Sequence, residues 1–321
     1  MPARSLRLTL AGLLGVAALA AGAQPWPSKP VRIVLQFPPG GSTDAVARVL
    51  AQSIGQSVGQ PVVVENKPGA DGAIAAETVI RADPDGHTVF MASNTPMMQV
   101  PLLRKNPPYD PVKDFTPITL VGRYIYFMVA APSVPAANGA EFIAWAKSQG
   151  PKLNFASYSS VPLLMHGRLK LAAGIDATVV PYKGEAAAIA EILAGRIHFT
   201  YATPTSTLQH IRDGRLKAFA TLLPTRAAMA PDIPTAAEAG VPPLPAGTWA
   251  AIFGPAKMPP EVTARVSREF NAALKRPDVV ERVAHQGIAL AGSTPEETGA
   301  FVREQLQQWS RAFKETGMQP E

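Results

Sequence analysis

Strand, loop and helix alternate along most of this 321-residue chain, and this alternation is the feature that most constrains its fold. Residues 31–37 read as a buried strand, which a Pro-Pro-Gly-Gly turn ends. Ser42 or Thr43 can then cap a helix that begins at Asp44. Because the same order recurs downstream, the sequence predicts an α/β fold with a largely parallel sheet.

Two extended stretches separate this alternation into two units. Residues 118–130 are long enough to cross from one unit into the next, and residues 248–253 read as a crossing back. Two α/β lobes joined by two crossings form a hinge with a ligand cleft between them. We therefore expect a first lobe of residues 24–124 with 247–321 and a second lobe of residues 125–246.

Residues 1–23 have the pattern of a secretory signal peptide. Arg4 and Arg7 precede an apolar run, and small residues lead up to a cleavage site between Ala23 and Gln24. The apolar run is roughly 13 residues long, which is short of the about 20 residues that span a bilayer. The pattern therefore predicts that the chain is exported to the periplasm.

The absence of cysteine removes several classes of function at once. A chain without thiols has no disulfide, no thiolate chemistry, no cysteine metal site and no lipidated lipobox. The net charge falls by two, from +6 to +4, when Arg4 and Arg7 leave with the signal peptide. The other Lys and Arg residues are scattered, so the chain lacks the clustered basic patch of a nucleic-acid-binding protein.

The polar residues form no recognisable catalytic or metal-binding pattern. No G-x-S-x-G nucleophile motif occurs, and the histidines show no metal-ligand spacing. Asp44 and Glu185 lie at predicted helix starts, where the helix dipole alone favours an acid. Trp249, on the return crossing, is the aromatic residue most readily placed near the cleft. We therefore predict a binding protein that has no catalytic residue, no metal and no cofactor.

The loops between strands and helices are the most informative part of the sequence. In open α/β sheets, ligands bind beyond the carboxyl ends of the strands, where helix N-termini present unpaired N–H groups. Gly40 and Gly41 would allow a ligand oxygen to approach the backbone closely. Four such junctions carry glycine or hydroxyl residues and are candidate carboxylate or phosphate sites, at 38–44, 93–95, 157–160 and 182–185.

Several segments resemble one known family. They are WPSKPVRIV (26–34), FPPGGSTD (37–44), VVENKPGA (63–70), PDG (84–86), YDPVKDFTP (109–117), VPYKG (180–184), PDIPT (231–235) and GSTPEE (292–297). In this order they are similar to the Bug family, the extracytoplasmic receptors of tripartite tricarboxylate transporters. The resemblance spans essentially the whole chain after the signal peptide.

This resemblance implies a type II periplasmic-binding-protein fold, whose two lobes close on a small carboxylate. It also implies a monomer that meets inner-membrane permease subunits transiently. The family holds the ligand carboxylate with loop backbone groups and ordered water, not with an arginine clamp. Carried onto this sequence, the ligand-binding residues are Pro39, Gly40, Gly41, Ser42, Thr43, Asp44, Ser93, Asn94, Thr95, Ser157, Tyr158, Ser159, Ser160, Tyr182, Lys183, Gly184, Ala202 and Thr203.

The chain departs from the family pattern at three places. Tyr158 and Leu163 stand where relatives often have a Gly/Ser-rich loop followed by histidine, and Ala202 stands where relatives often have an acid. The missing acid argues against an amino-acid-type ligand, and we expect a carboxylate with an apolar or aromatic body. Two other roles stay open: a loaded receptor that signals to a sensor kinase, and, with less support, a periplasmic enzyme.

Overall fold

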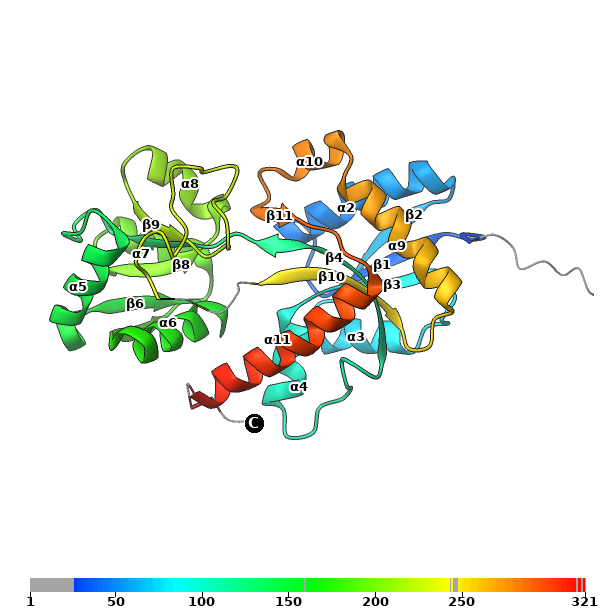
Figure 1. Ribbon diagram of the computed structural model, residues 1–321, viewed down its shortest axis with the longest axis horizontal. Helices are drawn as coiled ribbons and strands as arrows, with labels where there is room; N and C mark the ends of the chain where they lie inside the picture. Colours follow the sequence, from blue (N-terminus) through cyan, green and yellow to red (C-terminus); the bar gives the residue numbers. More distant parts are fainter. Residues whose placement is uncertain are drawn as a thin grey trace, which may run out of the picture.

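The computed structural model describes residues 26–158, 160–242, 244, 248–315, 317–318 and 320, and it consists of two α/β lobes side by side (Figure 1). The predicted signal peptide and its cleavage site lie outside these residues, as does Ser159. Within the described part of the chain, no helix combines the length and the apolar character needed to cross a membrane.

The first lobe is built on a six-stranded mixed sheet with the order β11-β4-β10-β3-β1-β2. The chain pairs β1 in parallel with β2 and β3, whereas β10 runs antiparallel to β3 and β4. Its strands are β1 (Val31–Leu35), β2 (Val62–Asn66), β3 (Thr88–Ser93), β4 (Phe115–Tyr124), β10 (Trp249–Pro255) and β11 (Ile288–Leu290). Its helices and turns are α2 (Ser42–Val58), η2 (Ala70–Gly72), α3 (Ala73–Ile80), η3 (Thr95–Gln99), α4 (Val100–Leu103), α9 (Pro260–Leu274), α10 (Pro277–Val283) and α11 (Pro295–Glu315).

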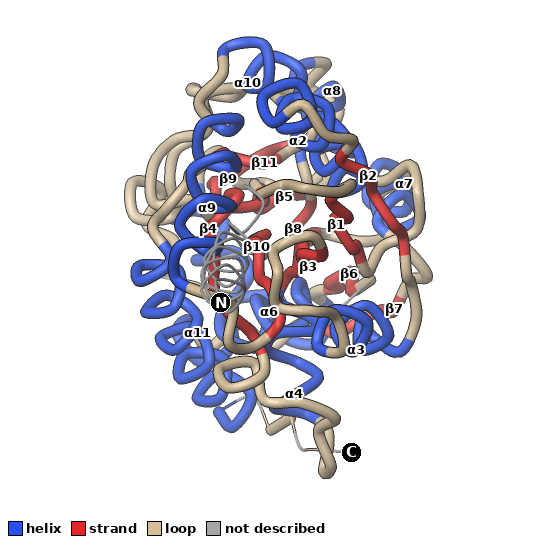
Figure 2. Tube along the Cα trace, turned by 90° about the vertical axis from the view of Figure 1, so that its right-hand side faces the viewer, coloured by secondary structure: helices blue, strands red, loops and turns tan. Residues whose placement is uncertain are grey.

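Both faces of this sheet are buried. Successive residues of a strand point to opposite faces, so Val34 and Phe90 pack with α3 and α11, while Ile33 and Met91 pack with α2 and α9. The two views agree that α2, α9 and α10 cover one face and that α3 and α11 cover the other (Figures 1 and 2). This double coverage explains why β3 is buried along its whole length.

The second lobe has a five-stranded sheet with the order β7-β6-β8-β5-β9. Within it, β6 runs parallel to β7 and β8, and β5 runs antiparallel to β8 and β9. Its strands are β5 (Phe127–Ala130), β6 (Asn154–Ser157), β7 (Thr178–Pro181), β8 (Phe199–Ala202) and β9 (Lys217–Thr221). Its helices and turn are α5 (Gly139–Gln149), η4 (Gly150–Lys152), α6 (Ser160–Ala173), α7 (Glu185–Leu193) and α8 (Pro204–Arg212).

Short stretches of chain connect the two sheets. On the outward path, Ile125 and Tyr126 separate the end of β4 from the start of β5. On the return path, the carbonyl of Thr248 accepts a hydrogen bond from the Tyr124 N–H at 2.8 Å, so the two crossings lie side by side. The C-terminal helix α11 also runs toward the second lobe (Figure 1), where α6 contacts it.

The sequence pattern did not predict the helical stretch formed by η3 and α4, and it also missed α8 and β11. The helix α8 opens with Pro-Thr-Ser-Thr, and the hydroxyl residues lower its helix propensity, although proline at the first helical position is favourable. The strand β11 spans three residues, too few for an alternating pattern to stand out. Both α8 and β11 lie at the junction of the lobes, where Gly287, just before β11, approaches Pro204 of α8.

Candidate functional site

The carboxylate of Asp44 holds the loop after β1 in shape. Its Oδ2 accepts a hydrogen bond from the backbone N–H of Gly40 at 3.0 Å, and both its oxygens pair with the Arg48 guanidinium at 2.9 Å. The Asn66 side chain donates to Oδ1 at 2.9 Å. Arg48 above all, with Gly40 and Asn66, lowers the pKa of Asp44 to about 2. Asp44 therefore holds the loop in shape through hydrogen bonds, a role in addition to the favourable charge that an acid contributes at a helix start.

The predicted side-chain cap of the first helix is wrong. Helix α2 begins at Ser42, with Gly41 at the N-cap position and no side chain capping it. The Thr43 hydroxyl is instead hydrogen-bonded to the Tyr124 hydroxyl at the end of β4. Because the first N–H groups of a helix have no acceptor within it, the start of α2 presents backbone donors next to the crossing strand.

Residues 93–95 are largely committed to the first lobe. Ser93 Oγ lies 2.7 Å from the side-chain amide of Gln36, and Asn94 Oδ1 accepts a hydrogen bond from the backbone N–H of Trp249 at 2.8 Å. Asn94 is fully buried, and its Nδ2 has no hydrogen-bond partner among the described residues. This Nδ2 group is therefore an unused donor at the carboxyl end of the central strand β3.

The loops after β6, β7 and β8 converge at one edge of the second sheet. The Tyr158 hydroxyl donates to the carbonyl of Tyr201 at 2.8 Å, and the carbonyl of Ser157 accepts the Tyr182 N–H at 2.7 Å. Because parallel strands end at the same edge, these bonds join loops that lie far apart in sequence. Helix α6 begins at Ser160, directly after the first of these strands and its loop.

The carboxylate of Glu185 lies at the start of α8. Its Oε1 accepts hydrogen bonds from the Thr203 backbone N–H at 2.7 Å and from the Thr203 hydroxyl at 2.8 Å, and it also accepts the Ser206 hydroxyl. Thr203 is the N-cap residue of α8 and makes no side-chain cap of its own. Glu185 therefore supplies an acid next to Ala202, which the family pattern alone did not reveal.

Three tyrosines connect these loops through the crossing strand. Burial raises the pKa of Tyr126 to about 12, with a hydrogen bond to Thr248 opposing the rise and the Glu185 carboxylate adding to it. Burial also raises the pKa of Tyr158, and the neighbouring Tyr126 and Glu185 side chains raise it further. The phenols therefore stay protonated at neutral pH and can donate hydrogen bonds. Tyr124, the last residue of β4, reaches Thr43 in the first lobe.

The predicted residues fall into two groups by exposure. Those that are exposed or half-buried are Pro39, Gly40, Gly41, Ser42, Thr95, Tyr158, Tyr182, Lys183, Gly184 and Thr203, and those that are buried are Thr43, Asp44, Ser93, Asn94, Ser157 and Ala202. Sequence reasoning missed Tyr124, Tyr126 and Ser206, and it gave Glu185 only a helix-dipole role. The available signal was the pair Tyr124 and Tyr126, two residues apart in the segment that was expected to cross between the lobes.

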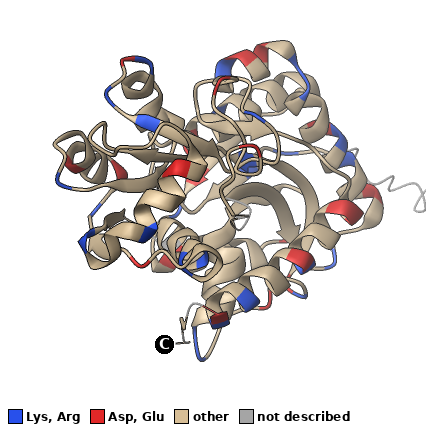
Figure 3. Cartoon of the chain, turned by 60° about the vertical axis from the view of Figure 1, so that its left-hand side comes forward, with Lys and Arg blue, Asp and Glu red and all other residues tan. Residues whose placement is uncertain are grey.

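The charge distribution does not favour a nucleic-acid or metal site. Lys and Arg are interspersed with Asp and Glu over both lobes in the view of Figure 3. Among the described residues, no group of three or more His, Asp or Glu side chains could hold a metal ion. The cationic side chain that enters the first loop, Arg48, is already paired with Asp44.

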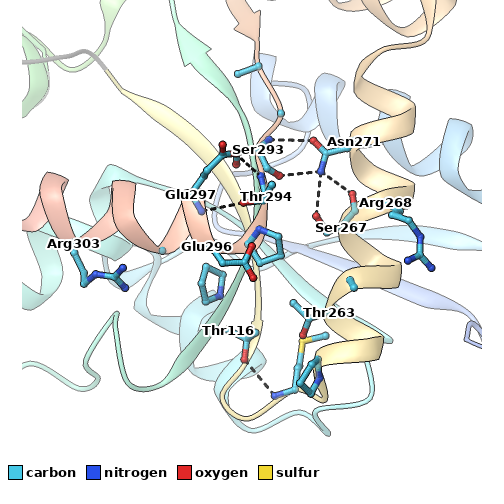
Figure 4. Close-up of a pocket in the computed structure, with 18 of the residues that line it drawn as sticks. Thr116, Thr263, Ser267, Arg268, Asn271, Ser293, Thr294, Glu296, Glu297 and Arg303 are labelled. Carbon is cyan, nitrogen blue, oxygen red and sulfur yellow. Dashed lines mark hydrogen bonds between the residues drawn. The ribbon is translucent and has the colours of Figure 1, made fainter.

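A pocket of about 990 Å³ lies elsewhere in the first lobe, between α9 and the start of α11 (Figure 4). Its polar groups are largely paired with one another. Asn271 donates to the Ser267 and Ser293 carbonyls at 2.8 and 3.0 Å, and Thr294 and Glu297 cap the helix reciprocally. None of the predicted ligand-binding residues lines this pocket, so it is separate from the loops described above.

Comparison with known proteins decides the family. Residues 46–318 match the model of the "Tripartite tricarboxylate transporter family receptor". The chain belongs to this receptor family. Protein BugT of Bordetella pertussis is 34% identical over 298 residues, which cover 92% of this chain and 91% of BugT.

Solved structures of receptor-family members have the same fold. The periplasmic binding protein BugD is 33% identical with a TM-score of 0.74, and the match covers 92% of this chain and all of BugD's. MatC from Rhodopseudomonas palustris, solved with bound malate, is 30% identical with a TM-score of 0.71 over 89% of this chain and 99% of its own. The expected periplasmic-binding fold is therefore confirmed. The family consists of periplasmic solute receptors, so the chain is a receptor that serves transport and not an enzyme.

Proposed function

We propose that this receptor captures a small carboxylate in a cleft between its lobes and presents it to the permease subunits of a tripartite tricarboxylate-type transporter. The lobes are residues 24–124 with 247–321 and residues 125–246. The mature protein begins at Gln24 after signal cleavage and acts as a monomer.

The uncapped start of α2 beside the crossing strand is the observation that supports this proposal most. Gly41 leaves the first N–H groups of a 17-residue helix without a side-chain acceptor. Such a helix end carries partial positive charge and donors directed at an incoming anion. The ligand carboxylate binds these amides, and the unused Nδ2 of Asn94 lies at the end of the neighbouring strand β3.

The loops of the second lobe close over the rest of the ligand. Tyr158, Tyr182 and Thr203 end or follow neighbouring strands and supply aromatic surface and hydroxyl groups. Malate in MatC supports the carboxylate class. The apolar or aromatic ligand body follows from Tyr158 and Leu163, two of the positions that differ from the family pattern.

Thermal unfolding of the mature protein with a panel of small acids tests this function. The protein is first unfolded and refolded to remove any ligand carried over from expression. A ligand at about 100 times its dissociation constant adds about 2.7 kcal/mol and raises the midpoint by several degrees. We expect one class of carboxylate to raise it and the matching amides to have no effect. If no acid shifts the midpoint, carboxylate capture is refuted.

A further inference from the structure

At the start of α8, a protein carboxylate occupies the hydrogen-bond donors of the chain. Glu185 follows Gly184 of the predicted ligand loop and is the first residue of α7. Its side chain reaches the next helix, where one oxygen accepts three hydrogen bonds from Thr203 and Ser206. The donors that a ligand carboxylate would need at this helix start are therefore already used.

The same carboxylate lies against the tyrosines of the interlobe junction. The Tyr158 hydroxyl donates to the carbonyl of Tyr201, two residues before the Thr203 that Glu185 binds. Burial raises the pKa of Tyr158, and the neighbouring Tyr126 and Glu185 side chains raise it further. Tyr126 belongs to the stretch that joins the two sheets. Glu185 thus lies directly after the predicted ligand loop 182–184, at the start of α7.

We propose that Glu185 is a specificity-determining residue that makes this receptor reject dicarboxylates in favour of ligands whose far end carries no negative charge. This inference rests on the proposed function. One ligand carboxylate binds the amides at the start of α2. A second carboxylate would meet the like charge of Glu185, and Thr203 and Ser206 would have no donor left for it. The selectivity predicted here differs from that of MatC, which is described with malate.

The test is calorimetric titration of the refolded mature protein with matched acids. Hexanoate is compared with adipate, butanoate with succinate, and benzoate with terephthalate. We expect the wild-type protein to bind at least one monoacid at least tenfold more tightly than its diacid. Glu185→Ala removes the charge and releases the donors, so it should reduce this preference at least tenfold through gained diacid affinity. Glu185→Gln keeps the side-chain length and an acceptor, and should shift the preference in the same direction.

Glu141 provides the matched control. It also caps a second-lobe helix, α5, where it accepts the Ala137 N–H and the Asn138 amide at 2.8 Å. Glu141 is exposed, and α5 lies at the outer side of the lobe (Figure 1). Glu141→Ala and Glu141→Gln should leave the monoacid-to-diacid ratio unchanged, and unliganded melting curves verify that all variants fold.

Three results would count against these claims in different ways. Equal wild-type affinity for a diacid and its monoacid would overturn the role of Glu185 and leave carboxylate capture intact. An unchanged ratio in both Glu185 variants would do the same. If neither kind of acid binds the wild-type protein, the proposed function itself fails, and this inference fails with it.

Discussion

The hydroxyl groups of Thr43 and Tyr124 are hydrogen-bonded to each other although 81 positions separate them in the chain. Thr43 lies in the first turn of α2, and Tyr124 is the last residue of β4 before the chain crosses to the second lobe. The bond therefore connects the proposed carboxylate-binding amides to the hinge, so that a movement of the hinge would displace the start of α2.

Tyr124→Phe should weaken ligand binding as well as stability. Loss of a buried hydroxyl pair costs about 1 kcal/mol, and the loosened start of α2 should lower carboxylate affinity by about three- to tenfold. Thr298→Val is the matched control, because it breaks another hydroxyl pair of the same lobe, the 2.7 Å pair of Thr298 with Ser293, which lies away from the loops. It should lower the melting temperature similarly and leave affinity unchanged. Equal affinity losses in both variants would contradict a specific role for Tyr124.

Asp44→Asn should loosen the first loop. The neutral amide loses the ion pair with Arg48, and its single oxygen cannot replace the two carboxylate oxygens that accept from Gly40, Arg48 and Asn66. We therefore expect a loss of about 1–2 kcal/mol and weaker carboxylate binding. Asp110→Asn is the control, since Asp110 caps a turn of the first lobe through the Val112 N–H at 2.9 Å, away from the loops. The carboxylate affinity measured by calorimetry should fall in Asp44→Asn alone. An unchanged affinity in that variant would show that the hydrogen bonds of Asp44 are not needed for ligand binding.

The stability of the protein in acid should depend on the ionisation of Asp44. Its pKa is lowered from 3.8 to about 2, chiefly by Arg48. The folded state therefore keeps this carboxylate ionised where the unfolded chain is already protonated. Its stabilising contribution is complete above about pH 4 and is lost as the pH falls toward 2. Denaturant titrations between pH 5 and 2.5 should show a shallower decline in Asp44→Asn than in the wild-type protein, and parallel declines would contradict this.

His166 should control stability at milder pH. Burial lowers its pKa from 6.5 to about 4, and its ring stacks on Phe155 with centroids 4.5 Å apart. Between these values the unfolded chain binds a proton that the folded chain does not, so stability falls as the pH drops from 6.5 to 4. His166→Gln, which cannot ionise, should flatten the dependence in that range. His210→Gln, on α8, serves as the comparison, and a wild-type curve that is flat from pH 6.5 to 4 would refute the prediction.

Asn94→Ala should destabilise the first lobe. The substitution removes the side-chain oxygen that accepts the buried backbone N–H of Trp249 at 2.8 Å, and an unpaired buried N–H costs about 1–3 kcal/mol. It also removes the proposed Nδ2 contact with the ligand. Asn138→Ala deletes an exposed helix cap and should cost about 1 kcal/mol with no change in carboxylate affinity. Urea denaturation and titration of both variants separate the two effects, and an unaltered affinity in Asn94→Ala would remove Asn94 from the site.

The sequence pattern predicted most elements to within a few residues, because their apolar periodicity is strong. It was less informative about side chains. Trp249 was expected near the cleft, but its ring is fully buried against Phe253 and Phe301. Thr43 was expected to cap α2, but its hydroxyl contacts Tyr124. Phe301 and Tyr124 are distant in the chain from Trp249 and Thr43, so no local pattern could indicate these contacts.

The sequence by itself determined the α/β class and the family, and it predicted the loops in which ligand groups gather. Those properties depend on periodicity, turn chemistry and motif order, all of which are local or can be read along the chain. The tertiary structure alone decided which polar groups remain for a ligand. Asp44 is hydrogen-bonded within its own loop, and Glu185 accepts the hydrogen bonds at the start of α8. The Nδ2 group of Asn94 has no partner among the described residues. Hydrogen-bond partners are a property of three-dimensional proximity, and this proximity arises only when both lobes have folded.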